Sequence, residues 1–404
     1  MDYSVKSDFV KELDRDISEY IQRGVGASDE QRFNELALRE FELQYRTMRQ
    51  YRNCCRMLKI SPLTIDRWDQ IPALCRFSLK RVLGKKTAFH ATGFMADTIC
   101  DCKKKSGKKY ITKTYSALQQ TTTDQSAGSY LFPTGKKMKI MALLPRPSMA
   151  PGMVMASGAK RIIDRFGAAD SRFLISPLGL DLKGLIAALL QAEKTGEPIA
   201  LIGGTRDFNH LLDALRRADI RFTLPQGSLI CDSGGYMGLY RESSPAEFQK
   251  KCFDQLGITE DYSINALWLC GCNTIFFDNS LKTATTGKVG ERCKELPCWV
   301  KTIVVDTRQF KRVAKGELGL IRHYDLSNRG TGFSFQLDIL GRETDQGFEV
   351  LGKWDGELGS YEFAEHGQHP GGRLATQLTD YMIRRKFAKI KMIYSKLLSK
   401  KTHT

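Results

Sequence analysis

The chain has 404 residues, of which 42% are hydrophobic and 26% are charged, a composition typical of a folded protein and unlike that of a disordered or collagen-like chain. No apolar stretch approaches the roughly 20 residues that a transmembrane helix requires. The first residues, Met1–Lys6, contain no apolar segment of the kind that secretory signals carry. We therefore expect a cytoplasmic protein whose eleven cysteines are mostly reduced.

The charge is strongly positive but unevenly distributed. Lys and Arg number 62 against 45 Asp and Glu, which gives +17. Residues 103–113 hold six lysines and no acid, and residues 381–404 hold eight Lys or Arg and no acid, so two segments carry 14 of the 17 net charges. No base-stacking or groove-reading motif accompanies either segment, so we expect solvated basic segments and no specific nucleic-acid binding.

The N-terminal region predicts helical structure from Ser7 to about Leu58. Apolar residues recur there at helical spacing among charged ones, namely Phe33, Leu36, Phe41, Tyr45, Met48 and Tyr51. Ser61-Pro62 ends this pattern. Residues 69–74 predict an extended connector, because the residue before Pro72 is disfavoured in the helical region.

Residues 158–240 predict alternating helices and strands. A helix is expected over 182–194 with Gly196 as its stop, followed by a strand over 199–202 that runs into Gly203-Gly204-Thr205. The unit then repeats, with a helix over 208–218 and a strand over 229–231 that ends in Asp232-Ser233-Gly234-Gly235. This pattern indicates a parallel sheet whose strand ends carry the ligand. Residues 299–305 are a third strand candidate.

From Lys315 onward, short strands punctuated by glycine predict an antiparallel part. Its segments are Gly316-Glu317-Leu318-Gly319-Leu320, Leu337-Asp338-Ile339-Leu340-Gly341-Arg342 and Gly347-Phe348-Glu349-Val350-Leu351-Gly352-Lys353. This series resembles the end of the large domain in acyl-adenylating enzymes, which reads G-E, then T-G-D-L-G-R, then D-G-F/Y-x-x-x-G-R. The spacing from Asp338 to Lys353 fits that series.

Within this superfamily, the chain most resembles the acyl-protein synthetase of the bacterial luminescence fatty-acid reductase system and the phenylacetate–CoA ligases. The resemblance covers residues 30–358, and its local matches are Phe33–Leu38, Ile71–Leu74 with Leu79-Lys80, Gly203-Gly204-Thr205, Gly234–Gly238 and Arg322–Asn328. It implies an α/β fold with a helical N-terminal segment (1–60), a parallel sheet and a small antiparallel part. The large domain would span 1–352, and residues 353–404 would form a truncated C-terminal segment with a basic amphipathic helix.

The resemblance also implies an activity and a site. Such enzymes use ATP and Mg²⁺ to convert a carboxylic acid into an acyl-adenylate and then pass the acyl group to a thiol. Asp338 would accept hydrogen bonds from the ribose hydroxyls, because a carboxylate is an acceptor only. Lys353 stands where the family has arginine and would contact ribose or phosphate as a point charge. Gly234 and Gly235 would let the backbone approach the adenine.

Two of the family's motifs are altered in this chain. The phosphate loop, S/T-S-G-T-T-G, retains only Thr92-Gly93, the candidate catalytic hydroxyl and its neighbouring nucleotide-binding glycine. The Y-G-x-T-E box, whose glutamate holds magnesium, falls by position on Leu267–Gly271, which contains no carboxylate. Glu260 and Asp261 lie upstream and would serve only after a rearrangement of the chain.

The end of the chain also departs from the relatives. No cysteine follows Cys298, so an acyl group would pass to an external thiol on a carrier protein, a reductase or coenzyme A. Lys386, Lys389 and Lys391 are candidates for the lid lysine of the ligases, against the alternative of a basic surface helix. Apolar residues at helical spacing in 384–401 indicate either peripheral contact with an anionic membrane or partner, or docking onto the protein's own core.

Cysteines and histidines suggest further possibilities. Cys270, Cys272, Cys293 and Cys298 form a candidate zinc set, since Zn²⁺ favours four thiolates, although buried apolar cysteines are the alternative. His366 and His369 lie in a Gly/Pro-rich turn without a clear third ligand. We therefore interpret them as turn residues.

The sequence as a whole predicts an acyl-protein synthetase-like ligase that activates a carboxylic acid, most simply a fatty acid, with ATP. The alternative is a subunit of the same fold that has lost ATP chemistry and binds an acyl group or a partner protein in a biosynthetic complex. The altered phosphate loop and the missing glutamate favour this alternative.

Overall fold

The computed structural model describes residues 7–75, 105–150, 153–234, 244–269, 272–287, 290–329, 332–354, 383 and 385–399. The chain divides into two compact units, each assembled from segments far apart in the sequence. Unit 1 comprises Met1–Ser126, Trp268–Phe276 and Cys293–Phe363, and unit 2 comprises Ala127–Leu267, Phe277–Arg292 and Ala364–Thr404. The domain boundary expected between residues 352 and 353 stays a prediction.

Unit 2 is built around a mainly parallel sheet. The strands are β2 (Lys139–Pro145), β3 (Arg172–Ser176), β4 (Gly179–Leu180), β5 (Ile199–Gly204), β6 (Leu229–Ser233), β7 (Ser263–Leu267) and β8 (Phe276–Phe277), in the spatial order β4-β3-β2-β5-β6-β7-β8. Strands β3, β2, β5, β6 and β7 are parallel, and β4 pairs antiparallel with β3. Central strands are buried on both faces, as expected where helices cover a parallel sheet.

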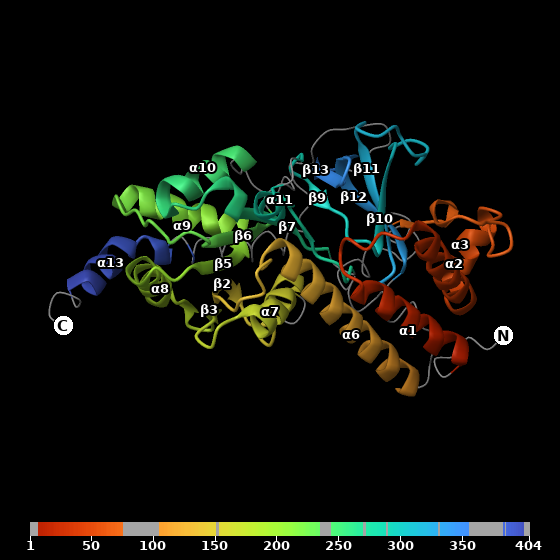
Figure 1. Ribbon diagram of the computed structural model, residues 1–404, viewed down its shortest axis with the longest axis horizontal. Coiled ribbons are helices and arrows are strands. Elements are labelled where there is room, and N and C mark those ends of the chain that lie inside the picture. The colour runs from red at the N-terminus through yellow and green to blue at the C-terminus, as the bar shows by residue number, and fades with distance from the viewer. Residues whose placement is uncertain are drawn as a thin grey trace. The chain divides into compact units, whose positions relative to one another are not determined.

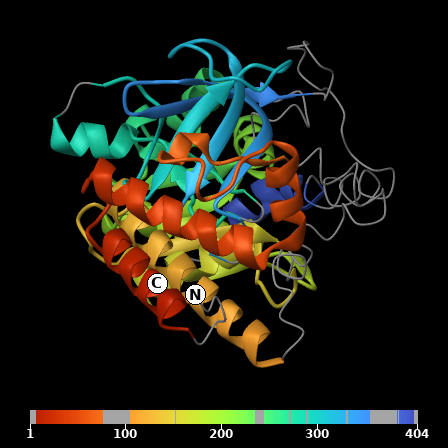
Figure 2. The ribbon, with the colours of Figure 1, turned by 90° about the vertical axis from the view of Figure 1, so that its right-hand side faces the viewer.

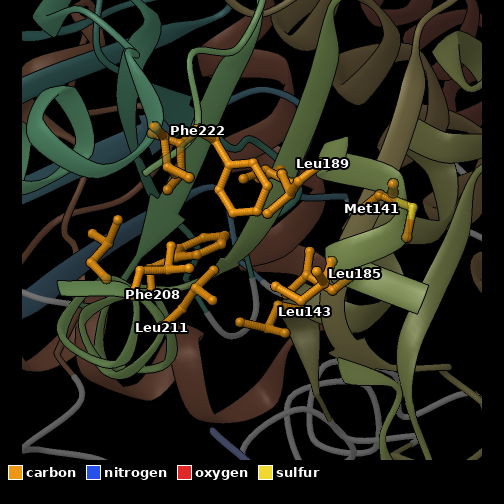
Figure 3. Close-up of a cluster of buried hydrophobic side chains, with 14 of the residues drawn as sticks. Met141, Leu143, Leu185, Leu189, Phe208, Leu211 and Phe222 are labelled. Carbon is orange, nitrogen blue, oxygen red and sulfur yellow. The ribbon is translucent and has the colours of Figure 1, made fainter. Parts of the chain in front are cut away.

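Helices connect these strands. They are α7 (Val154–Phe166), α8 (Leu182–Thr195), α9 (Thr205–Ala218), α10 (Pro245–Leu256) and α11 (Ser280–Thr286), with the 3₁₀ turn η3 (Glu260–Tyr262) before β7. The predicted helix over 182–194 is confirmed: the Asp181 side chain caps its first turn through Gly184 N, and Gly196 ends it in the left-handed conformation. Leucine and phenylalanine side chains of α8, α9 and the sheet point toward one another in the core (Figure 3).

The last described segment packs onto this core. Helix α13 (Ile390–Ser399) and the residues before it bury Ile383, Phe387 and Ile390 in the unit 2 cluster. Tyr394 meets Phe222 edge to face, with ring centroids 5.8 Å apart. Of the two interpretations of the basic tail, docking of its apolar face onto the protein's own core is therefore confirmed.

Unit 1 contains the antiparallel part. Its strands β9 (Lys294–Glu295), β10 (Val300–Val305), β11 (Gly319–Asp325), β12 (Ser334–Glu343) and β13 (Gly347–Lys353) lie in the order β10-β11-β12-β13-β9, and β1 (Leu74–Cys75) pairs parallel with β12. The strand expected over 299–305 is therefore present, but as β10 in this antiparallel sheet and not as a third parallel strand. Its β-branched residues favour any extended strand and cannot distinguish the two sheets.

Helices of the N-terminal region complete unit 1. The predicted helical segment consists of α1 (Asp8–Gln22), α2 (Glu30–Thr47) and α3 (Arg49–Met57), and the long α6 (Lys105–Tyr130) begins in the same unit. Figure 2 shows α1, in red, beside α2, in orange-red. Within unit 1, Arg329 is buried and forms ion pairs with Asp14 of α1 and Glu40 of α2.

No helix in the described ranges is both long and apolar enough to cross a lipid bilayer.

Candidate functional site

The carboxyl ends of the parallel strands form the edge at which open α/β sheets bind ligands. The chain runs from β2 outward to β3 and β4 on one side and then returns to β5 on the other side of β2. The strand order therefore reverses between β2 and β5. Gly203 near the end of β5 permits close packing there, because a β-carbon at Gly203 would lie 3.0 Å from Leu143 Cβ and 3.1 Å from the Phe208 ring. This glycine is therefore required by packing within the unit.

Gly234 follows β6 at the same edge. Its φ is +98°, in the region that favours glycine, and a β-carbon there would have no heavy atom of the described residues within 4 Å. The backbone conformation therefore explains the glycine, and the approach of an adenine to it stays a prediction. Gly235 lies outside the described residues.

A buried carboxylate joins two strands and the start of a helix at this edge. Asp232 of β6 is fully buried, and its Oδ2 accepts hydrogen bonds from Thr205 Oγ1 at 2.6 Å and from Asn265 Nδ2 of β7 at 2.9 Å. Asp232 and Thr205 are visible in the sequence only as parts of motifs, and Asn265 was not predicted. A polar residue inside an otherwise apolar strand was the available signal, since buried polar groups need partners.

A second carboxylate binds the backbone of β7. Asp278, after β8, accepts from Asn265 N at 3.1 Å and from Arg292 Nη2 at 2.7 Å and Nε at 3.0 Å. The Arg292 contact uses two guanidinium donors on one carboxylate oxygen, a charge-assisted arrangement that fixes both side chains. Asp232 thus binds the Asn265 side chain and Asp278 binds its backbone N–H, and together they hold the middle of β7 in place.

Asp338 lies in unit 1, inside β12, and is 5% exposed. The antiparallel register pairs Ile339 with Lys353, and Trp354 N donates to Asp338 O at 2.9 Å. The backbones of the two residues expected at the ribose therefore lie on neighbouring strands of one sheet. Gly234 belongs to the other unit, and the Lys353 side chain lies outside the described residues, as do Thr92 and Gly93.

The position expected for the magnesium glutamate is apolar. Strand β7 ends at Leu267, and both Leu267 and Leu269 are buried. Glu260 and Asp261 precede β7 and are exposed at its amino end, the sheet edge opposite to Gly234. These carboxylates are therefore not placed to substitute for the glutamate, and the described residues offer no carboxylate at this position for Mg²⁺.

The segment after this position is anchored to the end of β11. Buried Asp325 accepts hydrogen bonds from Ser327 N at 2.9 Å, Ser327 Oγ at 2.6 Å and Cys272 Sγ at 3.2 Å. Asn273 N donates to Asn328 Oδ1 at 2.8 Å, and Asn273 Nδ2 donates to Ser327 O at 2.7 Å. Residues in the second half of the Arg322–Asn328 match therefore form a clamp: they bind residues 272–274 and hold this segment in place.

Neighbouring His323 is buried against aromatic rings and is not suited to proton transfer. Its ring stacks on Phe276 with centroids 4.7 Å apart, and Nδ1 lies 2.6 Å from Thr302 Oγ1. Burial lowers the pKa of His323 from 6.5 to about 3, because the charged form loses its hydration. The imidazole therefore stays neutral near pH 7 and has a packing role.

Two of the candidate zinc cysteines, Cys272 and Cys298, bind different partners. Cys272 Sγ donates to Asp325, whereas Cys298 Sγ donates to Gly24 O at 3.2 Å. Burial raises the pKa of Cys272 well above its usual value, which opposes the thiolate that zinc needs. The described residues contain no group of three or more His, Cys, Asp or Glu side chains placed to hold a metal. Cys270 lies outside the described residues, and these contacts do not fit a zinc site.

The structure describes the candidate lid lysines but not the two histidines that were predicted to lie in a turn. Lys386, Lys389 and Lys391 are exposed on the docked C-terminal segment of unit 2. A β-carbon at Gly179, in edge strand β4, would lie 3.4 Å from Lys386 Cε, so Lys386 runs along that edge. His366 and His369 lie outside the described residues.

Comparison with known proteins confirms the predicted resemblance and the fold. A family model described as acyl-protein synthetase, LuxE, matches residues 23–334. No curated protein matches the sequence. Among solved structures, 2-hydroxyisobutyryl-CoA ligase in the postadenylation state with 2-HIB-AMP is 11% identical, with a TM-score of 0.56, over 86% of this chain and 72% of that chain.

Two further solved structures are similar to the chain, of which only the first supports the fold. An open conformation of 2-hydroxyisobutyryl-CoA ligase with 2-HIB-AMP and CoA is 11% identical over 86% of this chain and 80% of that chain, with a TM-score of 0.56. ATP-bound MatB from Rhodopseudomonas palustris is 11% identical over 58% of this chain, with a TM-score of 0.41, and the match spans only 44% of that chain. Identities this low show the fold alone. The family match covers more than half of the chain, which therefore belongs to the family of acyl-protein synthetases described as LuxE.

Proposed function

We propose that the protein uses ATP to activate a carboxylic acid, most simply a fatty acid, and transfers the acyl group to an external thiol. The family match over residues 23–334 is the observation that carries this proposal. The fold, which is that of adenylate-forming ligases, supports an adenylate-forming ligase-type enzyme.

In the proposed reaction, a carboxylate oxygen attacks the α-phosphorus of ATP, and the bond to the β-phosphate oxygen breaks to release pyrophosphate. The thiol sulfur of a carrier protein, a reductase or coenzyme A then attacks the acyl carbon and releases AMP, with loss of the thiol proton. The protein's contribution is mainly to position the reactants. Asp338 would accept from the ribose hydroxyls, and Gly234 would admit the adenine beside β6.

Thr92, Gly93, Gly235 and Lys353 remain candidates for the phosphate side of this site. Magnesium is usual for the reaction class, but Leu267 and Leu269 are buried where its carboxylate ligand is expected. No step is therefore assigned to the metal.

Pyrophosphate release from purified protein, with ATP and a panel of fatty and aromatic acids, tests the proposal. We expect acid-dependent release that Asp338→Ala lowers by at least about 100-fold, since a buried ribose contact through a charged acceptor accounts for several kcal/mol. Asp345→Ala is the matched control, because Asp345 is exposed on the turn between β12, which carries Asp338, and β13. Release that is absent with every acid, or that is equal in Asp338→Ala, would contradict the proposal.

A second candidate function is favoured by the apolar end of β7. A chain without the magnesium carboxylate would bind an acyl group or a partner protein in a biosynthetic complex without ATP chemistry. This alternative predicts no pyrophosphate release and no thermal stabilisation by ATP, because a ligand stabilises a protein only when it binds the native state.

A further inference from the structure

Unit 1 exposes three large apolar side chains at the end of α3. Met57 is 84%, Leu58 59% and Leu63 91% exposed. Lys59, with φ +58°, reverses the chain directly after the helix, and Ile60 N donates to Cys55 O at 2.9 Å. The turn is closed by Thr64 N donating to Ser61 O at 3.0 Å, so its own backbone hydrogen bonds hold the apolar side chains outward. We call Met57, Leu58 and Leu63 the α3 tip.

Cations surround the α3 tip. The sequence from Leu43 to Ile65 contains five Lys or Arg and no Asp or Glu. Arg49, Arg56 and Lys59 are exposed, and no carboxylate in the described part of the chain forms an ion pair with any of the three. Figure 1 shows α3 and the chain after it, in orange, beside α2. Exposed apolar side chains and uncompensated positive charge therefore occur together in one short segment.

We propose that the α3 tip is a docking surface for an anionic lipid bilayer. Apolar side chains that project from a turn can enter the boundary between headgroups and acyl chains, while adjacent cations contact anionic headgroups. A protein partner is less suited, because a standard interface buries about 800 Å² on each side, more than three side chains provide. The proposal does not depend on the proposed ligase activity.

Co-sedimentation of the full chain with vesicles tests the apolar contribution. The chain should bind vesicles of phosphatidylcholine mixed with phosphatidylglycerol and should bind pure phosphatidylcholine weakly. The double variant Leu58→Ser/Leu63→Ser should weaken binding by at least about tenfold. Each substitution removes the favourable free energy of moving a leucine side chain from water into the bilayer. Phe253→Ser in unit 2 is the matched control, because Phe253 is 58% exposed on a helix that also carries acids, and it should leave binding unchanged.

The charge contribution is tested separately. Arg49→Glu/Arg56→Glu should weaken binding to the anionic vesicles by about fivefold for each cation removed. Arg308→Glu/Lys311→Glu, on an exposed turn of the same unit, is the control. Equal binding to neutral and anionic vesicles, or wild-type binding by both tip variants, would overturn the proposal. Loss of binding in the arginine variant with full binding in the leucine variant would also overturn it, because a purely electrostatic surface then fits an acidic protein better.

Discussion

Each of the two units has a buried carboxylate at or near the end of a strand, but the two carboxylates stabilise different parts of the structure. In unit 2, Asp232 accepts hydrogen bonds from Thr205 at the start of α9 and from Asn265 of β7, and so fixes the sheet near Gly234. In unit 1, Asp325 takes donors from its own turn and from Cys272, and so fixes the segment after the expected magnesium position. That position is apolar in its described residues, where Leu267 and Leu269 are buried, so a metal carboxylate is missing there while the adenosine contacts of Asp338 and Gly234 stay a proposal.

The largest expected effect comes from removing the unit 1 carboxylate. Asp325→Ala leaves Ser327 and Cys272 without their acceptor in a buried site and should lower the free energy of unfolding by about 3 kcal/mol. Amide hydrogen exchange should rise at Asn273 and Ser327, whose N–H groups belong to this clamp. Asp232→Ala should instead raise exchange around β6 and β7. Equal exchange patterns in the two variants would show that the carboxylates do not act locally.

The next effect is a pH dependence that comes from unit 1. The folded-state pKa of His323 is lowered to about 3, below the unfolded value of 6.5, so the unfolded chain binds a proton that the folded chain excludes. The stability is fully present above pH 6.5 and decreases as the pH falls toward 3. Between pH 7.5 and pH 5 the loss from this group should be about 2 kcal/mol.

Denaturant titrations of wild type and His323→Phe at the two pH values measure this contribution. Phenylalanine keeps an aromatic ring against Phe276 and does not titrate. The variant should therefore lose less stability than wild type between pH 7.5 and pH 5. The same loss in both proteins would show that His323 is not the source.

The smallest expected effect is at the edge of unit 2. Gly234→Ala should destabilise the protein by about 1 kcal/mol, because alanine resists φ near +98° although no described residue obstructs its methyl group. ATP affinity should fall as well, if the adenine lies against this backbone. Gly196→Ala is the matched control, since Gly196 also has positive φ and open surroundings but lies at the far end of α8. A fall in ATP affinity of the same size in both variants would argue against adenine binding at Gly234.

The local features of the fold were predictable, and the long-range ones were not. Asp181 and Gly196 bracket α8 as capping rules require, and the strands that precede the glycine pairs lie where the sequence places them. Strands β2, β3 and β7 were missed. Whether β10 joins one sheet or the other depends on partners distant in sequence, which periodicity does not encode.

The residues of the candidate site show the same contrast between local motifs and long-range contacts. Asp338 was predicted through a spaced motif, whereas Asn265 became visible only once the fold brought it to Asp232, 33 residues away. The Arg329 ion pair with Glu40 joins residues 289 positions apart. Such contacts arise from tertiary packing, so the sequence pattern names single residues but not their partners.

The central claim is that ATP is held at its adenosine end, with Asp338 as the ribose acceptor. Equilibrium binding of ATP to wild type and to Asp338→Asn, measured by titration calorimetry, tests it most directly. The claim predicts that wild type binds ATP and that the substitution weakens binding by about tenfold, since a hydrogen bond to a charged group contributes about 1.5–3 kcal/mol. No ATP binding by wild type, or equal affinity in the two proteins, would contradict it.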